Sequence, residues 1–221
     1  MHSSTSNSDF VRPVPTVPWR ALLAAVVVTT TAATIGWEAW VRTRGYAPTL
    51  DDTSDLWAEA RASVRPDSVV LIGTSRMLFD IDLDEAEQAL GRRPIQLSIV
   101  GSSPFPILAD LAADESFRGT VFCDIVPAMF LAPPGSPPYL ASEKALQRSK
   151  HWNLAQQWSH ALSLPLERHV AFMQQEDLTL AKLLERLPIP DRAQAQIGPQ
   201  LPPYFYALDR DRRARMVPES A

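Results

Sequence analysis

The sequence predicts a mixed α/β domain carried on one N-terminal membrane helix. An uncharged stretch of 17 residues, Ala21–Trp37, lies near the N-terminus. Behind it, three short apolar runs rich in β-branched residues alternate with segments of helical periodicity. Strands that alternate with helices of about ten residues form parallel βαβ units with right-handed crossovers. We therefore expect a three-stranded parallel sheet with helices on both faces, followed by a helical C-terminal region.

The uncharged stretch is predicted to be a single-pass membrane anchor over residues 19–42. At 1.5 Å per residue, 17 residues span about 26 Å, near the lower limit for a hydrocarbon core of about 30 Å. Tryptophans at both ends, Trp19, Trp37 and Trp40, are typical of an interfacial belt. A buried soluble helix and a cleaved signal peptide are the alternatives, although no clean cleavage site follows. Arginines flank the stretch equally on both sides, so charge leaves its orientation open.

Prolines and glycines divide the rest of the chain. The Ser- and Pro-rich residues 1–18 are predicted to form a disordered tail, and residues 43–66 a stalk with one short helix, Asp55–Ala62. The α/β core follows at residues 67–130. Its predicted strands are Ser68–Ile72, Ile95–Val100 and Thr120–Val126, and its predicted helices are Glu85–Leu90, capped by Asp82 or Asp84 and closed by Gly91, and Pro106–Ala113.

Residues 131–221 are predicted to form a Pro-rich connector, a helical region and a tail. The charged segment Asp209–Arg215 in that tail is predicted to be exposed. The predicted helices are Ser142–Gln156, Gln157–Leu162, Leu166–Gln175 and Leu178–Leu187, followed by Pro188 and Pro190.

The composition excludes several classes of protein. The chain of 221 residues carries 25 acidic and 21 basic residues, a net charge of −4 at pH 7. Non-specific nucleic-acid binding needs a basic surface, so we expect no nucleic-acid partner. Cys123 is the only cysteine, which excludes an internal disulfide, and the histidine spacing is not typical of a metal site. We expect no metal, no cofactor and an inert thiol at Cys123.

Two of the three predicted strands end in a glycine that hydroxyl residues follow. In open parallel sheets, ligands bind at the carboxyl ends of the strands, near the topological switch point. Ser75 is the stronger candidate nucleophile, because a tight turn would direct its Oγ and its N–H into one crevice, at the start of a helix. Gly101 would supply a second N–H to an oxyanion, since no Cβ blocks its backbone. The candidate substrate-binding residues beside them are Thr74, Arg76 and Ser102.

These segments resemble the SGNH (GDSL-like) hydrolase superfamily, in particular its bacterial membrane-anchored members. Val69–Arg76 is similar to the first block of that family, with Ser75 at the nucleophile position, and Leu97–Ser103 is similar to the second, with Gly101 at the oxyanion-hole glycine. The resemblance covers residues 19–130 and implies a flavodoxin-like three-layer sandwich. It also implies hydrolysis or transfer of ester-linked acyl groups on a carbohydrate or lipid substrate, by a domain on the outer side of the bacterial inner membrane.

Two departures from the family pattern bear on catalysis. The third block would place an asparagine after the third strand, where this chain has Asp124, and no histidine has an aspartate three residues before it, as the last block requires. A serine without a general base is a poor nucleophile at neutral pH. His160 and His169 are the remaining candidate bases, although both are more typical of structural histidines. The domain is therefore predicted to be incomplete. Its function is left open between a weak serine esterase or acyltransferase, a non-catalytic binding or scaffold domain, and a truncated gene product.

Other candidate residues have structural alternatives. Arg76 would clamp an anionic substrate, or pair with Asp80 or Asp82. Asp124 would orient a base, bind a cation or accept backbone N–H groups. One helical stripe is predicted to pack in the core, and if exposed it would instead mark a partner or membrane surface. The stripe consists of Trp152, Leu154, Ala155 and Trp158.

Overall fold

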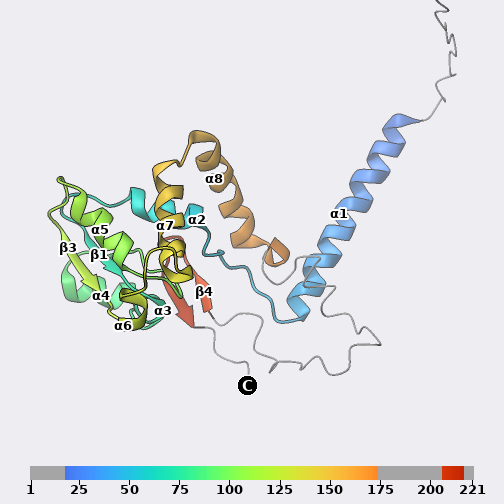
Figure 1. The fold of residues 1–221 in the computed structure, drawn as a ribbon. Helices are drawn as coiled ribbons and strands as arrows, with labels where there is room; N and C mark the ends of the chain where they lie inside the picture. The colour runs from blue at the N-terminus through green and yellow to red at the C-terminus, as the bar shows by residue number, and fades with distance from the viewer. Residues whose placement is uncertain (1–17, 174–205, 217–221) are drawn as a thin grey trace, which may run out of the picture. The chain divides into compact units, whose positions relative to one another are not determined.

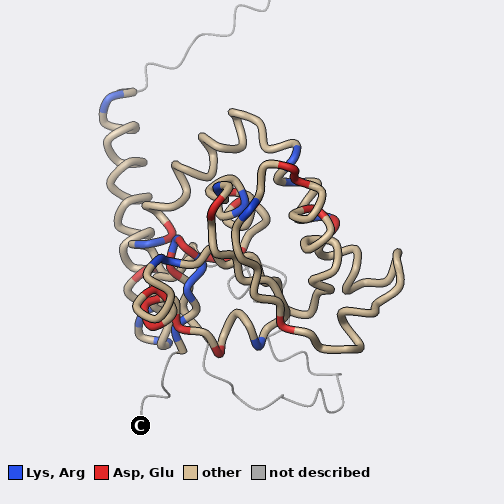
Figure 2. The backbone as a smooth tube through the Cα atoms, turned by 90° about the vertical axis from the view of Figure 1, so that its left-hand side faces the viewer, with Lys and Arg blue, Asp and Glu red and all other residues tan. Residues whose placement is uncertain are grey.

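The computed structural model describes residues 18–173 and 206–216, and the chain divides into two compact units, Met1–Trp40 and Val41–Ala221. Helix α1, Trp19–Thr43, makes up the described part of the first unit, and its last three residues belong to the second. The most apolar 18 residues of α1 have a mean hydropathy of 1.5, and none of them is buried. Figure 2 shows this helix uncharged along most of its length. Its 25 residues extend about 37 Å, so α1 is long and apolar enough to cross a membrane.

The second unit contains the predicted parallel sheet. Strands β1 (Val69–Ile72), β2 (Ile95–Gln96) and β3 (Thr120–Cys123) are all parallel and lie in the order β2-β1-β3. The regular part of β2 is shorter than predicted, but the ladder continues, because Leu97 N donates to Leu71 O (2.8 Å) and Ile99 N to Gly73 O (3.2 Å). Every residue of β1 is buried, as expected for the central strand of a parallel sheet.

The helices of the second unit follow the predicted α/β alternation. Thr53 caps α2 by accepting from Leu56 N, Asp82 caps α4 by accepting from Asp84 N, and Gly91 closes α4. The helices are α2 (Ser54–Ala62), α3 (Ser75–Phe79), α4 (Leu83–Leu90), α5 (Phe105–Ala113), α6 (Pro127–Phe130), α7 (Pro137–Lys150) and α8 (Leu154–His169). A short 3₁₀ helix, η1 (Ala171–Met173), follows the last of these helices.

The helical region differs from the prediction at its breaks. The predicted helix Ser142–Gln156 is wrong at its end, because α7 stops at Lys150 and Asn153 starts α8 with a capping box to Gln156. Helix α8 then continues through Pro165, so the predicted second and third helices form one element. Several predicted segments lie outside the described residues. They are the tail up to residue 17, the end of the predicted third helix, the predicted helix Leu178–Leu187, and Pro188 and Pro190.

The main core lies on one face of the sheet. Val70 and Ile72 of β1 pack with Leu97 beneath helices α2, α5 and α7, and Trp57 of α2 donates its indole N–H to Leu97 O at 2.9 Å. Figure 1 shows α7 beside α2, and α5 also contacts α7. The fully or nearly buried side chains of this cluster are Trp57, Ala60, Val70, Ile72, Leu97, Ile107, Leu111, Ala145 and Leu146.

A C-terminal hairpin covers the open edge of β2. Strands β4 (Tyr206–Leu208) and β5 (Ala214–Met216) pair antiparallel, and β5 contacts α3. Between them, Arg212 is fully buried and donates to Gln96 O (2.9 Å) and Ser98 O (2.8 Å), and its guanidinium also binds both carboxylate oxygens of Asp52 at 2.8 Å. The prediction that this charged segment is exposed is therefore wrong at Arg212, because its guanidinium satisfies strand-edge carbonyls that would otherwise lack partners.

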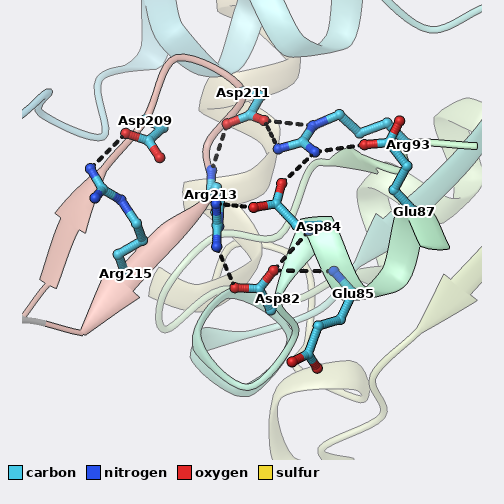
Figure 3. Close-up of polar contacts among 9 residues, drawn as sticks. All are labelled: Asp82, Asp84, Glu85, Glu87, Arg93, Asp209, Asp211, Arg213 and Arg215. Carbon is cyan, nitrogen blue, oxygen red and sulfur yellow. Dashed lines mark hydrogen bonds and ion pairs between the residues drawn. The ribbon is translucent and has the colours of Figure 1, made fainter. Parts of the chain in front are cut away.

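Arginine–carboxylate pairs join the rest of the hairpin to α4 (Figure 3). Arg213 donates to Asp82 at 2.7 Å and also pairs with Asp84. Arg93, after α4, donates to Asp84 (2.7 Å), to Glu87 (2.8 Å) and to Asp211 of the hairpin (Nε, 2.7 Å). The Arg213 guanidinium lowers the pKa of Asp82, and the surrounding carboxylates raise the pKa of Arg93.

Glu59 links α2 to both α8 and the hairpin. Its carboxylate lies 3.2 Å from His160 Nε2 of α8 and accepts from Arg210 Nε at 3.0 Å. Partial burial raises the pKa of the Glu59 carboxyl, but the hydrogen bonds from Arg210 and His160 outweigh burial, so the net pKa lies below the usual value.

Replacement of Arg212 will destabilise the domain strongly. We expect Arg212→Leu to lower the free energy of unfolding by about 3 kcal/mol, because Asp52 and two strand carbonyls lose their partner in a buried site. Arg215→Leu is the matched control: it removes an exposed pair with Asp209 and is expected to cost about 0.5 kcal/mol. Urea unfolding of the full chain in detergent, followed by tryptophan fluorescence, measures both. Equal losses in the two variants would contradict the role given to Arg212.

Acid will weaken the Glu59 link. Because the pKa of Glu59 is lowered in the folded state, its contribution is fully present above the unfolded pKa of about 4.5 and is lost as the pH falls through the folded value. We expect Glu59→Gln to reduce the free energy of unfolding by about 1 kcal/mol at pH 7 and by less near pH 3. Urea unfolding at a series of pH values tests this, with the exposed Glu143→Gln as control. A loss that does not change with pH would contradict the assignment.

Candidate functional site

The predicted nucleophile lies at the carboxyl end of the central strand. Gly73 and Thr74 follow β1, and Ser75 is the first residue of α3. Ser75 is partly exposed, and among the described residues its Oγ has no hydrogen-bond partner. Thr74, not Ser75, occupies the N-cap position, and it makes no capping bond. Helix α3 has only five residues, so its dipole gives Ser75 less support than the sequence suggested.

The structure brings the two glycine-containing turns together. The bond from Ile99 N to Gly73 O places the turn after β2 beside the turn after β1. Gly101 is exposed, has a φ of 68°, and a Cβ added there would meet nothing within 4 Å. This left-handed conformation favours glycine and leaves the backbone open to a ligand. Ser102, a predicted substrate-binding residue, is instead fully buried and donates to Ile99 O at 3.0 Å.

Asp124 closes the site on the other side of β1. It follows β3, and its carboxylate accepts from Thr74 Oγ1 (3.1 Å) and from Arg76 Nη2 (2.6 Å). The predicted partners of Arg76 were Asp80 or Asp82, and the structure corrects this to Asp124. Sequence distance misled that prediction, because parallel pairing brings the ends of β1 and β3 together although 48 positions separate the two residues.

Gly73 permits this close approach. A Cβ built on Gly73 would lie 2.8 Å from Asp124 Cβ and 2.8 Å from Met77 Cβ. Any larger residue would therefore push the end of β3 and the start of α3 apart. Gly73 is the site residue whose role sequence reasoning did not assign, and its only sequence signal was its position at a strand end. Asp124 was a candidate for orienting a base, binding a cation or accepting backbone N–H groups, but its carboxylate instead accepts from the side chains of Thr74 and Arg76.

The strand order locates the switch point of the sheet. The chain passes from β1 to β2 on one side and then to β3 on the other, so its direction reverses between β1 and β3. Thr74, Arg76 and Asp124 meet at that point, with Ser75 beside them. The arrangement can present the Ser75 hydroxyl and the half-exposed Arg76 guanidinium to a ligand. Thr74, a predicted substrate-binding residue, is instead buried, and its hydroxyl is bound to Asp124.

The histidines do not complete a catalytic pair with Ser75. His160 is buried, bound to Glu59 and next to Trp152, and His169 Nδ1 lies 2.7 Å from Pro165 O in its own helix. His151 Nδ1 likewise contacts Gln147 O. Of these three histidines none bonds to Ser75, and His2 lies outside the described residues. The hydroxyl therefore has no imidazole base in the described part of the chain.

The remaining candidates offer no other chemistry at this site. Burial, together with the neighbouring Asp124 charge, raises the pKa of the Cys123 thiol, which keeps it protonated and weakly nucleophilic. Residues 18–173 and 206–216 contain no group of three histidine, cysteine or acidic side chains placed to hold a metal ion. Two shallow hollows of about 400 and 420 Å³ lie elsewhere, under α5 and beside β3, and Ser75 lines neither.

Comparison with known proteins adds no relative to this picture. No protein-family model, no curated protein and no solved structure matches the chain.

Proposed function

We propose that this chain is a single-pass membrane protein of the bacterial envelope whose domain is SGNH-hydrolase-like, degenerate or truncated, and at most a weak esterase or acyltransferase. Helix α1 would anchor it in the inner membrane, with the domain on the outer side. The observation that carries the proposal is Ser75 at the end of the central strand, with the open Gly101 turn on the neighbouring strand and with no imidazole base within residues 18–173 and 206–216.

The weakness of the activity follows from the surroundings of Ser75. A serine hydroxyl attacks an acyl carbon well only when a base removes its proton, and loss of that base costs several orders of magnitude in rate. The ends of β1 and β2 would still offer backbone N–H groups from Ser75 and Gly101 to an oxyanion. An acylated carbohydrate or lipid is the substrate class that the family resemblance suggests.

The open side of the sheet supports an incomplete domain. Among the described residues no strand lies beyond β3, and Phe122 on that strand is 42% exposed. An apolar side chain on an uncovered strand is typical of a sheet that lacks its next element.

The second candidate is a non-catalytic binding or scaffold domain at the membrane. The contacts of Asp124 favour it, because both carboxylate oxygens are engaged by Thr74 and Arg76 and so hold the switch point in one arrangement. His160 contacts Glu59, which also binds Arg210, so this histidine belongs to a different group of contacts from Ser75. A binding site of this kind would use the exposed edge of Arg76 and needs no base.

A fluorophosphonate probe separates the two candidates. For the weak enzyme we expect labelling of the folded full chain about a thousandfold slower than that of serine hydrolases with complete triads. Ser75→Ala will abolish the labelling, whereas Ser159→Ala, which removes an exposed serine of α8, will leave it unchanged. In-gel fluorescence against time gives the rates. Absence of labelling in folded protein would reject catalysis at Ser75 and leave the binding domain.

A further inference from the structure

Helix α8 turns an apolar face outward. Its large exposed side chains recur every four residues: Leu154 is 72% exposed, Trp158 68%, Leu162 67% and Leu166 51%. We call these four residues the α8 apolar face. The smaller exposed residues between them are mostly apolar as well, namely Ala155, Ala161 and Pro165. The predicted packing of Leu154, Ala155 and Trp158 in the core is therefore wrong.

The inward side of α8 explains why the helix cannot simply rotate. His160 and Leu164 are its buried residues; His160 bonds to Glu59, and Leu164 packs with Leu50, Leu56 and Leu208. The core thus fixes which side of α8 faces inward. The outward side is left with the large apolar residues, the reverse of what an ordinary water-facing helix shows.

Charged side chains are absent from α8 as far as Leu166. From Leu154 to Leu166 the sequence contains no aspartate, glutamate, lysine or arginine. Charged side chains return only in the last turn, at Glu167 and Arg168, beside His169. An exposed face of leucine and tryptophan matches the apolar side of helices that lie in a membrane interface, and in α8 the opposite side packs on the domain.

The basic end of α8 adjoins the residues that directly follow the proposed membrane span. Arg42 Nη2 donates to His169 O at 3.0 Å, and Val41 and Tyr46 pack with Ala171 and Phe172. Val41 is covalently next to the last residue of the first unit. If α1 crosses the bilayer, this end of α8 lies at the interface, and Trp158, 11 residues from His169, is about 16 Å further along the helix.

We propose that the α8 apolar face lies in the headgroup region of the lipid bilayer that α1 crosses. The inference rests on the proposed anchoring and extends it: the protein would contact its membrane through two separate helices, one spanning and one interfacial. A second contact of this kind would fix the orientation of the domain above the lipid. Because the face is uncharged, it needs no anionic lipid of its own, and only its basic end would favour one.

An environment-sensitive fluorophore on α8 tests the proposal. In the full chain carrying Cys123→Ser, Leu162→Cys is labelled with a nitrobenzoxadiazole dye and reconstituted into vesicles of phosphatidylcholine with a minority of phosphatidylglycerol. We expect spin-labelled lipids to quench this dye several-fold more strongly than a dye at Glu143→Cys, on the exposed side of α7. Leu154→Cys gives the same reading from the other end of the face, should one variant fold poorly by circular dichroism.

Each other outcome overturns the inference. Strong quenching by aqueous iodide and none by lipid means that the face stands in water. Protection from both quenchers means that protein covers it, either a second copy of the chain or another segment of the same one. Extraction of the membranes by alkaline carbonate distinguishes failure of the proposed α1 anchor from failure of the α8 proposal. Release of the protein would contradict the anchor itself. Retention without quenching by lipid would contradict only the interfacial role of α8.

Discussion

The buried guanidinium of Arg212 is the interaction on which the assembly of the domain depends. Its backbone is left-handed, with a φ of 61°, an unfavourable conformation for a side chain of this size. Four hydrogen bonds to Asp52, Gln96 and Ser98 offset that cost. They tie the segment before α2, the edge of β2 and the hairpin together. Because the extended β2 ladder holds Ile99 against Gly73, the same contact indirectly positions the turn that carries Ser75.

Local patterns predicted the local structure well. The apolar runs at β1 and β3, the Asp82 cap and the Gly91 stop depend on residues close in sequence, so the residues alone indicated them. The hairpin could not be found in this way. Its segment reads as a run of alternating charge, and only contacts more than 100 positions away bury Arg212. The exposure of the apolar side of α8 was not predicted for the same reason. Periodicity shows that a helix has an apolar stripe, but it does not show whether that stripe packs against the core.

The candidate site shows the same division. The position of Ser75 at a strand end followed from the chain itself, and so did its neighbourhood with the Gly101 turn, because parallel strands end at one edge of a sheet. The partner of Arg76 could not be predicted in this way. Asp124 lies next to Arg76 because β3 pairs with β1, and that strand order is not evident from the distance between the two residues in the sequence. The histidines show that residue type alone is a weak signal for a catalytic base. No motif pointed to His160 or His169 as a base, and the structure gives each of them another contact, to Glu59 and to Pro165 O.

The ion pairs on α4 and the exposed apolar face of α8 differ in the surroundings of the two helices. The outward side of a helix that faces water usually carries charged residues. Helix α4 follows this pattern, because Asp84 and Glu87 form ion pairs with arginines. From Leu154 to Leu166 of α8 the chain does not do so, and the end of this helix contacts the residues that follow the proposed span. Ion pairs join the hairpin to α4, and large apolar side chains are exposed on α8, the helix whose end contacts the residues that follow the proposed span. If the α8 apolar face lies in the bilayer as proposed, a ligand site at the switch point would be held at a fixed distance from the lipid, which suits a substrate or partner that is itself attached to a membrane surface.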